Sequence, residues 1–209
     1  MKNISDQRLN LPRHAPVMVL PNALLFPDSL LPLYIFEPRY RAMLEWSLEQ
    51  HRMFCIALVK RGISEWHSPD DFHHVAGVGL VRACVRRSDG TFQLILQGLT
   101  RVHFVGFSQE QPFIIAELRE ILTADANREE ADTLSARVLE LCARYRALGM
   151  DVPEALDNQL AEMRNPAALS DLVAHAFVRD PYRRQSVLEK ANVAERLRTL
   201  IEHLQAELL

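Results

Sequence analysis

Apolar positions in the first half of the chain repeat with the spacing of β-strands. Residues 53–59 form an unbroken apolar run, Met-Phe-Cys-Ile-Ala-Leu-Val, which indicates a strand buried on both faces. Residues 101–107 and 113–121 divide their side chains between two alternating sets, as in a strand whose faces differ. Two shorter apolar strands are predicted before them, within residues 17–35.

A hairpin is predicted where two β-prone runs, residues 78–87 and 91–97, flank Ser88-Asp89-Gly90. Asp-Gly between such runs favours a type I′ turn, because both central positions of that turn require a positive φ. Proline cannot donate a hydrogen bond to a neighbouring strand, so the early strands are expected at edges, ends or bends. The prolines concerned are Pro21, Pro27 and Pro32.

One helix is predicted between the early strands, with Pro38 in its first turn, where the missing N–H costs nothing. The face it would bury consists of Tyr40, Met43, Leu44, Ser47 and Leu48. About six strands with one or two short helices, and no regular β-α-β alternation, indicate a twisted antiparallel barrel or pseudo-barrel.

The second half of the chain changes to a helical period near residue 124. Apolar positions from Ala131 to Leu148 step by three and four residues, and Gly149 suits the end of that helix. Three further helix starts have a capping residue before the first turn. They are Asn165 before Pro166, Asp180 before Pro181, and Asn192 with Glu195. A bundle of four or five helices is therefore expected.

At 209 residues, the chain can bury a substantial core as one domain or two small ones. Its formal net charge of −3 gives no overall attraction to nucleic acid or anionic lipid. Cys55, Cys84 and Cys142 are far apart among apolar neighbours, which favours buried thiols over a disulfide framework. The start of the chain is polar, and no apolar run approaches the ~20 residues of a membrane span. We therefore expect a cytoplasmic protein that does not bind membranes.

The sequence motifs of nucleotide binding and of serine catalysis do not occur in the chain. There is no Gly-x-x-x-x-Gly-Lys-Ser/Thr phosphate loop, and no lysine lies beside a serine motif that suits a serine–lysine dyad. No Gly-x-Ser-x-Gly elbow is present either. The chain is expected to be neither an enzyme nor a cofactor carrier.

One loop gathers imidazoles and carboxylates, which leaves a small metal-dependent hydrolase as one hypothesis. Its residues are His67, Asp70, Asp71, His73 and His74. Their spacing matches no established ligand pattern, and Ser-Pro-Asp-Asp is typical of solvated turns. No metal is therefore expected.

Several different short motifs are spread over nearly the whole chain. The most specific is Phe36, Glu37, Pro38, Arg39 and Tyr40. A glycine-bearing segment at residues 75–79, a Gly-x-x-Arg element at Gly98 and Arg101, and a Leu-Glu-rich ending at 188–197 follow it. Together these motifs resemble the amino-terminal substrate-recognition domain of the Lon proteases.

The resemblance implies a PUA-like antiparallel β pseudo-barrel over residues 1–123, followed by an α-helical bundle over 124–209, an α+β fold. It also implies a non-catalytic protein- or peptide-binding module that recognises unfolded or tagged proteins or serves as a proteolysis adaptor. The long helix that leads to the ATPase of Lon is not found before Leu209. A stand-alone protein that works with a separate ATPase or protease is therefore expected.

The motif residues are expected to have mainly structural roles. Phe36 to Tyr40 would start a helix, and Arg39 and Arg101 would pair with carboxylates inside the domain. Tight β geometry is expected at Gly77, Gly79 and Gly98. A surface for unfolded protein should expose apolar groups. The candidates for it are Leu24, Leu25, Phe26 and Trp66.

RNA binding is the alternative function, since PUA-like barrels often recognise RNA. Arginines near the predicted hairpin could contact phosphates, with Phe92 and Phe104 available for stacking. These arginines are Arg82, Arg86, Arg87 and Arg101. A solvated β face explains the same residues, so the protein-binding hypothesis is preferred to nucleic-acid binding.

Overall fold

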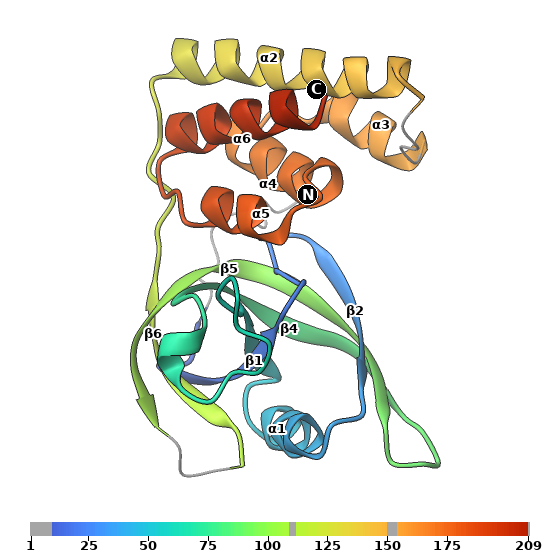
Figure 1. Ribbon diagram of the computed structural model, residues 1–209, viewed down its shortest axis with the longest axis vertical. Helices are drawn as coiled ribbons and strands as arrows, with labels where there is room; N and C mark the ends of the chain where they lie inside the picture. Colours follow the sequence, from blue (N-terminus) through green and yellow to red (C-terminus); the bar gives the residue numbers. More distant parts are fainter. Residues whose placement is uncertain (1–9, 109–111, 150–153, 209) are drawn as a thin grey trace.

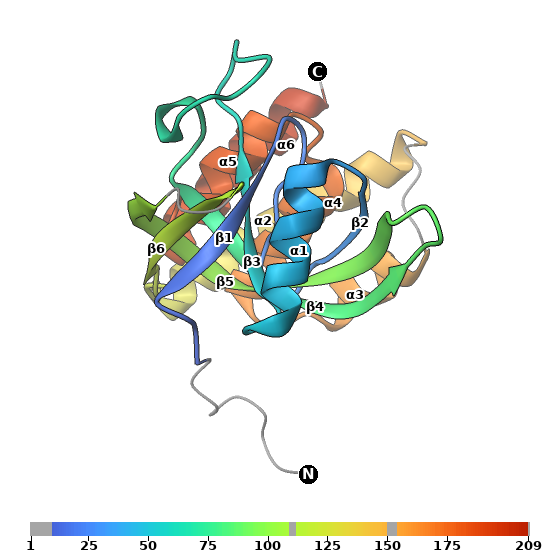
Figure 2. The same cartoon turned by 90° about the horizontal axis from the view of Figure 1, so that it is seen from below.

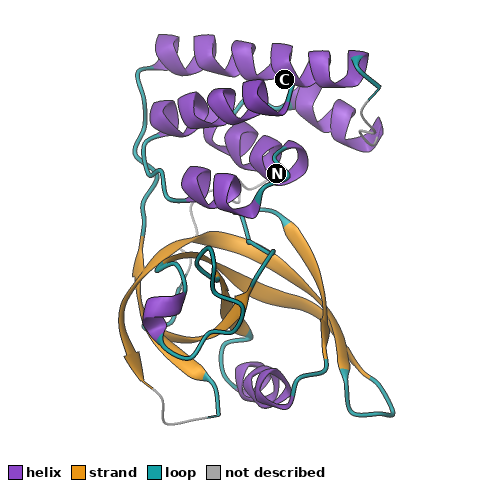
Figure 3. Cartoon of the chain, viewed as in Figure 1, coloured by secondary structure: helices purple, strands orange, loops and turns teal. Residues whose placement is uncertain are grey.

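The strands and most helices occupy opposite ends of the molecule (Figure 1). The computed structural model describes residues 10–108, 112–149 and 154–208. Five α-helices gather at one end, and the strands curl into a second body that carries α1 and the short 3-10 helix η2 (Pro69–Asp71) (Figure 3). The predicted α+β class is confirmed.

Six strands form one sheet that closes on itself. They are β1 (His14–Leu20), β2 (Leu30–Ile35), β3 (Met53–Leu58), β4 (Val75–Arg86), β5 (Phe92–Ser108) and β6 (Ile114–Glu120). Their order is β2-β5-β4-β3-β1-β6, with a further pairing of β5 to β6. Because β5 also reaches the far end of this series, β5, β4, β3, β1 and β6 close a barrel. The edge strand β2 extends the sheet beyond it.

The barrel is mixed, which corrects the prediction of a purely antiparallel one. β1 pairs with β3 in parallel, with Val17 opposite Cys55 and Leu20 opposite Leu58. Between these two strands the chain passes through β2 and α1, and such a crossover connection is what parallel pairing requires. The other pairings among the six strands are antiparallel.

The two strands expected at 91–97 and 101–107 are one strand of 17 residues, β5. The strand is continuous although its pairing is irregular at two places. The register with β4 shifts between Val78 and Gly79, and the register with β6 shifts between Phe104 and Gly106. Its length lets β5 pair with β2, β4 and β6.

The hairpin between β4 and β5 is present, but its turn differs from the predicted type I′. Gly90 alone in the turn has a positive φ, +81°, and its N–H donates to the carbonyl of Arg87. The Asp89 carboxylate accepts hydrogen bonds from the N–H and the hydroxyl of Thr91, which holds the turn with one left-handed residue. The loop is therefore a three-residue hairpin loop, Ser88 to Gly90, whose last residue is the left-handed glycine.

The helix α1 (Pro38–Glu49) crosses the barrel end opposite the other helices (Figure 2). It buries Tyr40, Met43, Leu44 and Ser47, which are four of the five residues of the predicted face. The prolines also lie where expected: Pro21 follows β1, Pro27 lies in a loop and Pro32 is on the edge strand.

The remaining helices stack over the other end of the barrel. They are α2 (Arg128–Ala147), α3 (Glu154–Glu162), α4 (Pro166–Phe177), α5 (Pro181–Leu188) and α6 (Val193–Glu207). Asn165, Asp180 and Asn192 cap α4, α5 and α6 through their side chains, which confirms the predicted starts. No helix within the described residues has the length and apolarity needed to cross a membrane.

Candidate functional site

The segment expected to be an exposed apolar loop is buried, so that expectation is wrong. Leu24, Leu25 and Phe26 have 2%, 0% and 0% of their surface exposed. The side chains of Leu24 and Phe26 belong to the apolar core of the helical bundle, whereas Leu25 belongs to the core between the barrel and α1. Successive residues of an extended segment point to opposite sides. The segment therefore packs the two halves of the molecule together.

The three glycines of the family-like motifs make room for this segment. A Cβ at Gly77 would fall closer than 3.0 Å to the carbonyl oxygen of Leu25, and one at Gly98 would overlap the carbonyl oxygen of Phe26. A Cβ at Gly79 would lie 2.6 Å from the Leu25 side chain. Tight geometry at the glycines thus arises from the close approach of another backbone.

The motif from Phe36 to Tyr40 starts α1 and attaches it to the barrel. Pro38 opens the helix. The buried Tyr40 hydroxyl donates to the carbonyl of Val19 at 2.9 Å and accepts from its N–H at 3.2 Å. Burial raises the pKa of this hydroxyl, so it stays protonated. Arg39 pairs with Glu37 at 2.9 Å, a partner within the domain.

Arg101 pairs across the two halves of the molecule. Its guanidinium, 2% exposed, donates to both carboxylate oxygens of Asp171 on α4 and to the carbonyl of Leu188 at 2.9 Å. Arg196 on α6 donates to the same carboxylate at 3.3 Å and to the carbonyl of Lys190. The carboxylate expected to pair with Arg101 therefore belongs to the helical half of the molecule. It lies beyond residue 123, the predicted end of the β domain.

Two buried guanidiniums share one carboxylate in this cluster, which leaves one excess positive charge. Burial lowers the pKa of Arg196 to about 10, so it remains charged at neutral pH. The carbonyl of Leu188, the last residue of α5, and the carbonyls of Lys190 and Ala191 just beyond the helix also accept hydrogen bonds from the cluster. The last carbonyls of a helix carry partial negative charge, which offsets the excess.

Trp66 is half-buried, with its ring edge-to-face against Phe72 at 5.9 Å between centroids. The guanidinium of Arg39 lies over the indole at 5.0 Å. Trp66 therefore contributes mainly to packing at the barrel end, and little of it is available to an unfolded protein.

The imidazoles and carboxylates of the loop before β4 do not converge. Asp71 accepts from the N–H groups of His67 and Ser68, His73 contacts Glu189 at 3.0 Å, and His74 contacts the carbonyl of Pro69. Across the described ranges, no three His, Cys, Asp or Glu side chains are grouped so as to hold a metal ion. The structure gives no support to the metal-enzyme hypothesis.

A different surface exposes the large apolar side chains. Leu30, Tyr34, Phe36 and Val85 are 57%, 50%, 59% and 62% exposed, and they lie on or next to the strands β2 and β4. The rings of Tyr34 and Phe36 stack with centroids 5.9 Å apart. Tyr34 and Val85 flank β5 because both pair with Gln93.

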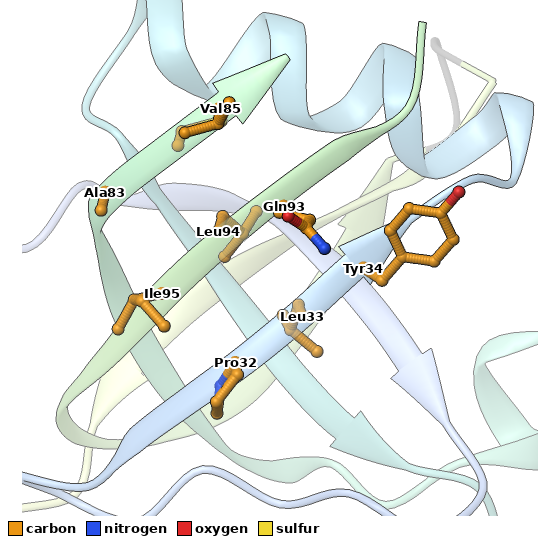
Figure 4. Close-up of a pocket in the computed structure, with 9 residues that line it drawn as sticks. Pro32, Leu33, Tyr34, Ala83, Val85, Gln93, Leu94 and Ile95 are labelled. Atoms are coloured by element: carbon orange, nitrogen blue, oxygen red, sulfur yellow. The ribbon is translucent and has the colours of Figure 1, made fainter. Parts of the chain in front are cut away.

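Strand alternation decides which side chains of β2, β5 and β4 point toward this surface. Pro32 and Ala83 both pair with Ile95, so these three side chains form a row across β2, β5 and β4 (Figure 4). A shallow pocket of about 460 Å³ lies here. The opposite face of the same strands contributes to the core over α1 through Ile35, Leu94 and other residues. We call the apolar set that points outward the outer apolar face: Leu30, Pro32, Tyr34, Phe36, Ala83, Val85 and the half-buried Ile95.

The hydrophobic pattern of the sequence, unlike its family motifs, indicates that this face is a contact surface. From Leu30 to Phe36, both alternating sets of side chains are apolar, although β2 is an edge strand with one face exposed. Polar residues are expected on a solvated face. An apolar set on each side of an edge strand therefore indicates a contact surface.

Two solved structures share this fold. The N terminal domain of Mycobacterium avium complex Lon protease matches with a TM-score of 0.73 and 19% identity, over 92% of this chain and 98% of that one. A Lon N-terminal domain protein from Xanthomonas campestris matches with a TM-score of 0.64 and 18% identity, over 90% and 97%. At these identities the likeness shows the fold alone.

Longer proteins named Lon protease also match the chain. A Lon protease of Dictyoglomus thermophilum is 24% identical over 203 residues, which is 97% of this chain and 26% of that protein. Lon protease 2 of Herpetosiphon aurantiacus is 28% identical over 197 residues, which is 92% of this chain and 24% of that protein. The chain thus spans about a quarter of the length of these relatives.

The family itself is established by a match over most of the chain. The model of the family described as the ATP-dependent protease La (LON) substrate-binding domain matches residues 14–206. The chain belongs to this family, and the resemblance drawn from its motifs is confirmed. The matched residues correspond to the substrate-binding part of LON, which is a binding module.

Proposed function

We propose that this protein binds unfolded or flexible polypeptide segments on the outer apolar face. The observation that carries the proposal is a concentration of exposed apolar groups. Within the described residues, seven large hydrophobic side chains are exposed, and Leu30, Tyr34, Phe36 and Val85 belong to this one face. Clustered exposed apolar side chains, unlike single ones, mark interaction surfaces.

The chemistry of the face suits a tolerant binding module. Its aliphatic and aromatic groups offer contact area without a fixed pattern of hydrogen bonds, so clients with different sequences can bind. The stacked Tyr34 and Phe36 rings are rigid, which reduces the conformational entropy lost on binding. The strands beneath are fixed by the core over α1, so the face is preformed.

We further propose that bound segments are passed to a separate ATPase or protease, so that the protein acts as a proteolysis adaptor in the cytoplasm. The family match to a LON substrate-binding domain supports this role, as does the name Lon protease given to the longer relatives. The three cysteines are free, which suits a reducing compartment.

A binding assay with matched variants tests the proposed surface. The probe is a reduced, carboxymethylated protein that stays unfolded, and its affinity is measured by fluorescence anisotropy. Replacing two exposed rings, Tyr34→Ser with Phe36→Ser, should weaken binding by about tenfold. The control changes two exposed leucines elsewhere, Leu122→Ser with Leu148→Ser, and should change affinity by less than about twofold. Equal effects of the two pairs would contradict the proposal.

The RNA alternative is not supported by the placement of its residues. Phe92 and Phe104 are 4% and 2% exposed, so neither ring can stack on a base. Arg101 is buried in its ion pair with Asp171, and Arg86 lies over the Phe92 ring with Glu45 3.6 Å away. The expected basic strip is thereby reduced to Arg82 and Arg87.

A further inference from the structure

We propose that the outer apolar face selects polypeptide segments in which acidic side chains flank the apolar ones. This inference rests on the proposed function and specifies the class of segment that is bound. Two guanidiniums, those of Arg82 and Arg87, lie at the margin of the face along β4, and each is held by a glutamine of the neighbouring β5.

Arg82 reaches the face because of an irregularity in β4. Val81 pairs with Leu96 and Ala83 with Ile95, so Arg82 is an extra residue in the ladder. Its Nε donates to the side-chain oxygen of Gln97. Gln97 pairs with Leu30 of β2, so the guanidinium is positioned at the Leu30 end of the outer apolar face.

Arg87 is positioned at the other end of the same face. Its Nη2 donates to the side-chain oxygen of Gln93 at 3.2 Å. Gln93 pairs with both Tyr34 and Val85, which are among the exposed groups of the face. The two arginines therefore bracket the apolar residues, one beside Leu30 and one beside Tyr34.

Both guanidiniums retain capacity for a bound carboxylate. No described Asp or Glu forms a salt bridge with Arg82 or Arg87, although several other arginines have such partners. Asp89 is the nearby carboxylate of the hairpin turn, and it accepts from the Thr91 N–H and hydroxyl. The amide of a glutamine neutralises no charge, so each hydrogen bond orients a guanidinium without forming an ion pair. Hydrogen bonds from Thr91 lower the pKa of Asp89, and the charge of Arg87 acts in the same direction, so Arg87 interacts with this exposed carboxylate without a direct contact, whereas Arg82 forms no salt bridge with a described carboxylate.

The arrangement complements a segment with apolar residues at its centre and carboxylates on its flanks. The apolar side chains would contact Pro32, Tyr34 and Ile95, and the carboxylates would meet the guanidiniums at the two ends. Lysines in the flanks would be repelled by the same charges. Because these groups are exposed, each ion pair adds only about twofold to fivefold in affinity, so the effect is selection among segments that bind already.

Three synthetic peptides test the inference. They share one core rich in leucine and valine and carry two glutamates, two lysines or two serines at each end. Affinity is measured by anisotropy at low and at moderate salt. The glutamate-flanked peptide should bind about fivefold more tightly than the serine-flanked one, the lysine-flanked peptide more weakly, and salt should reduce the difference.

Charge variants identify the groups responsible. Arg82→Gln with Arg87→Gln should remove the preference for glutamate flanks while leaving the affinity for serine flanks within about twofold. The matched control is Arg128→Gln with Arg144→Gln, which removes the same charge from exposed positions on α2 and should preserve the preference. Loss of the preference in both pairs would show a net-charge effect and would overturn the proposal.

The outcomes separate this inference from the proposed function. If all three peptides bind with equal affinity, the outer apolar face binds polypeptide but the charge selection is wrong. If none binds, the proposed function fails and the selection fails with it. A preference that disappears only in the Arg82 and Arg87 variant supports both.

Discussion

The carbonyl oxygen of Phe26 occupies the space that a Cβ atom would need at Gly98. The two backbones are also hydrogen-bonded, since Asp28 donates to the Gly98 carbonyl at 3.0 Å and Gly98 donates to the Ser29 carbonyl at 2.9 Å. A glycine on the barrel thereby fixes the segment whose leucine and phenylalanine fill the core beneath the helices. The two halves of the molecule are joined at this point.

Replacing this glycine should destabilise the whole protein. For Gly98→Ala, the added methyl group overlaps main-chain atoms that cannot rotate away, so we expect a loss of about 3 kcal/mol in the free energy of unfolding. Urea unfolding followed by circular dichroism measures it. The control is Gly106→Ala, whose Cβ would make an ordinary contact at 3.5 Å and should cost less than about 1 kcal/mol. Equal stability of the two variants would refute the packing role.

The buried ion cluster predicts a second large effect. Asp171→Asn keeps the shape of the side chain but leaves the guanidiniums of Arg101 and Arg196 buried without a counter-charge. We expect a loss of about 3–5 kcal/mol, as when one partner of a buried pair is removed. The exposed pair of Asp132 with Arg128 provides the comparison, and Asp132→Asn should cost less than about 1 kcal/mol. A loss below about 1 kcal/mol in both variants would show that the cluster does not hold the two halves together.

Stability should fall in mild acid. Burial lowers the pKa of His175 in the folded protein, and the charge of Arg184 acts in the same direction. Below about pH 6.5 the unfolded chain takes up a proton that the folded protein resists, so the free energy of unfolding decreases. Urea midpoints at about pH 7 and about pH 5 should show this decrease, and His175→Gln should reduce it.

Two other imidazoles that are partly buried add to the same trend, because desolvation also lowers the pKa values of His103 and His203. If His175→Gln leaves the pH dependence as it is in the wild type, the contribution assigned to His175 is wrong.

The cysteines distinguish the two faces of the sheet. Burial raises the pKa of Cys142 to about 12 and raises that of Cys55 as well, and both side chains are almost fully enclosed. Cys84 is partly exposed, but it pairs with Leu94 and packs against the core over α1, so its side chain lies on the other face of β4 from Ala83 and Val85. A maleimide should therefore label Cys84 first in the native protein, and a serine-flanked peptide bound on the outer apolar face should leave that rate unchanged. A rate that falls at saturating peptide would place the peptide on the α1 side of the sheet.

Local features of the fold were predictable from the sequence because they depend on nearby residues. The caps at Asn165, Asp180 and Asn192 and the start of α1 at Pro38 each follow from a few neighbouring positions. The hairpin was also predictable, although its turn type depends on how the Asp89 side chain is hydrogen-bonded.

The errors concern contacts between residues far apart in sequence. Leu24 to Phe26 have the pattern of an exposed loop, and glycines more than fifty positions away bury them. Gly77 and Gly98 do indicate that something approaches closely, but a single sequence does not say which segment. Similarly, Asp171 interrupts an apolar helix, which signals a buried partner without identifying Arg101.

Photo-crosslinking tests the central claim most directly, because it locates the bound segment without assuming which residues contact it. An unfolded, carboxymethylated protein bearing benzophenone groups is bound to the wild-type chain and irradiated, and the linked peptides are identified by mass spectrometry. The account predicts crosslinks within residues 30–36 and 82–97, on β2, β4 and β5. Crosslinks confined to the helices α2 to α6, with these strands untouched, would contradict it.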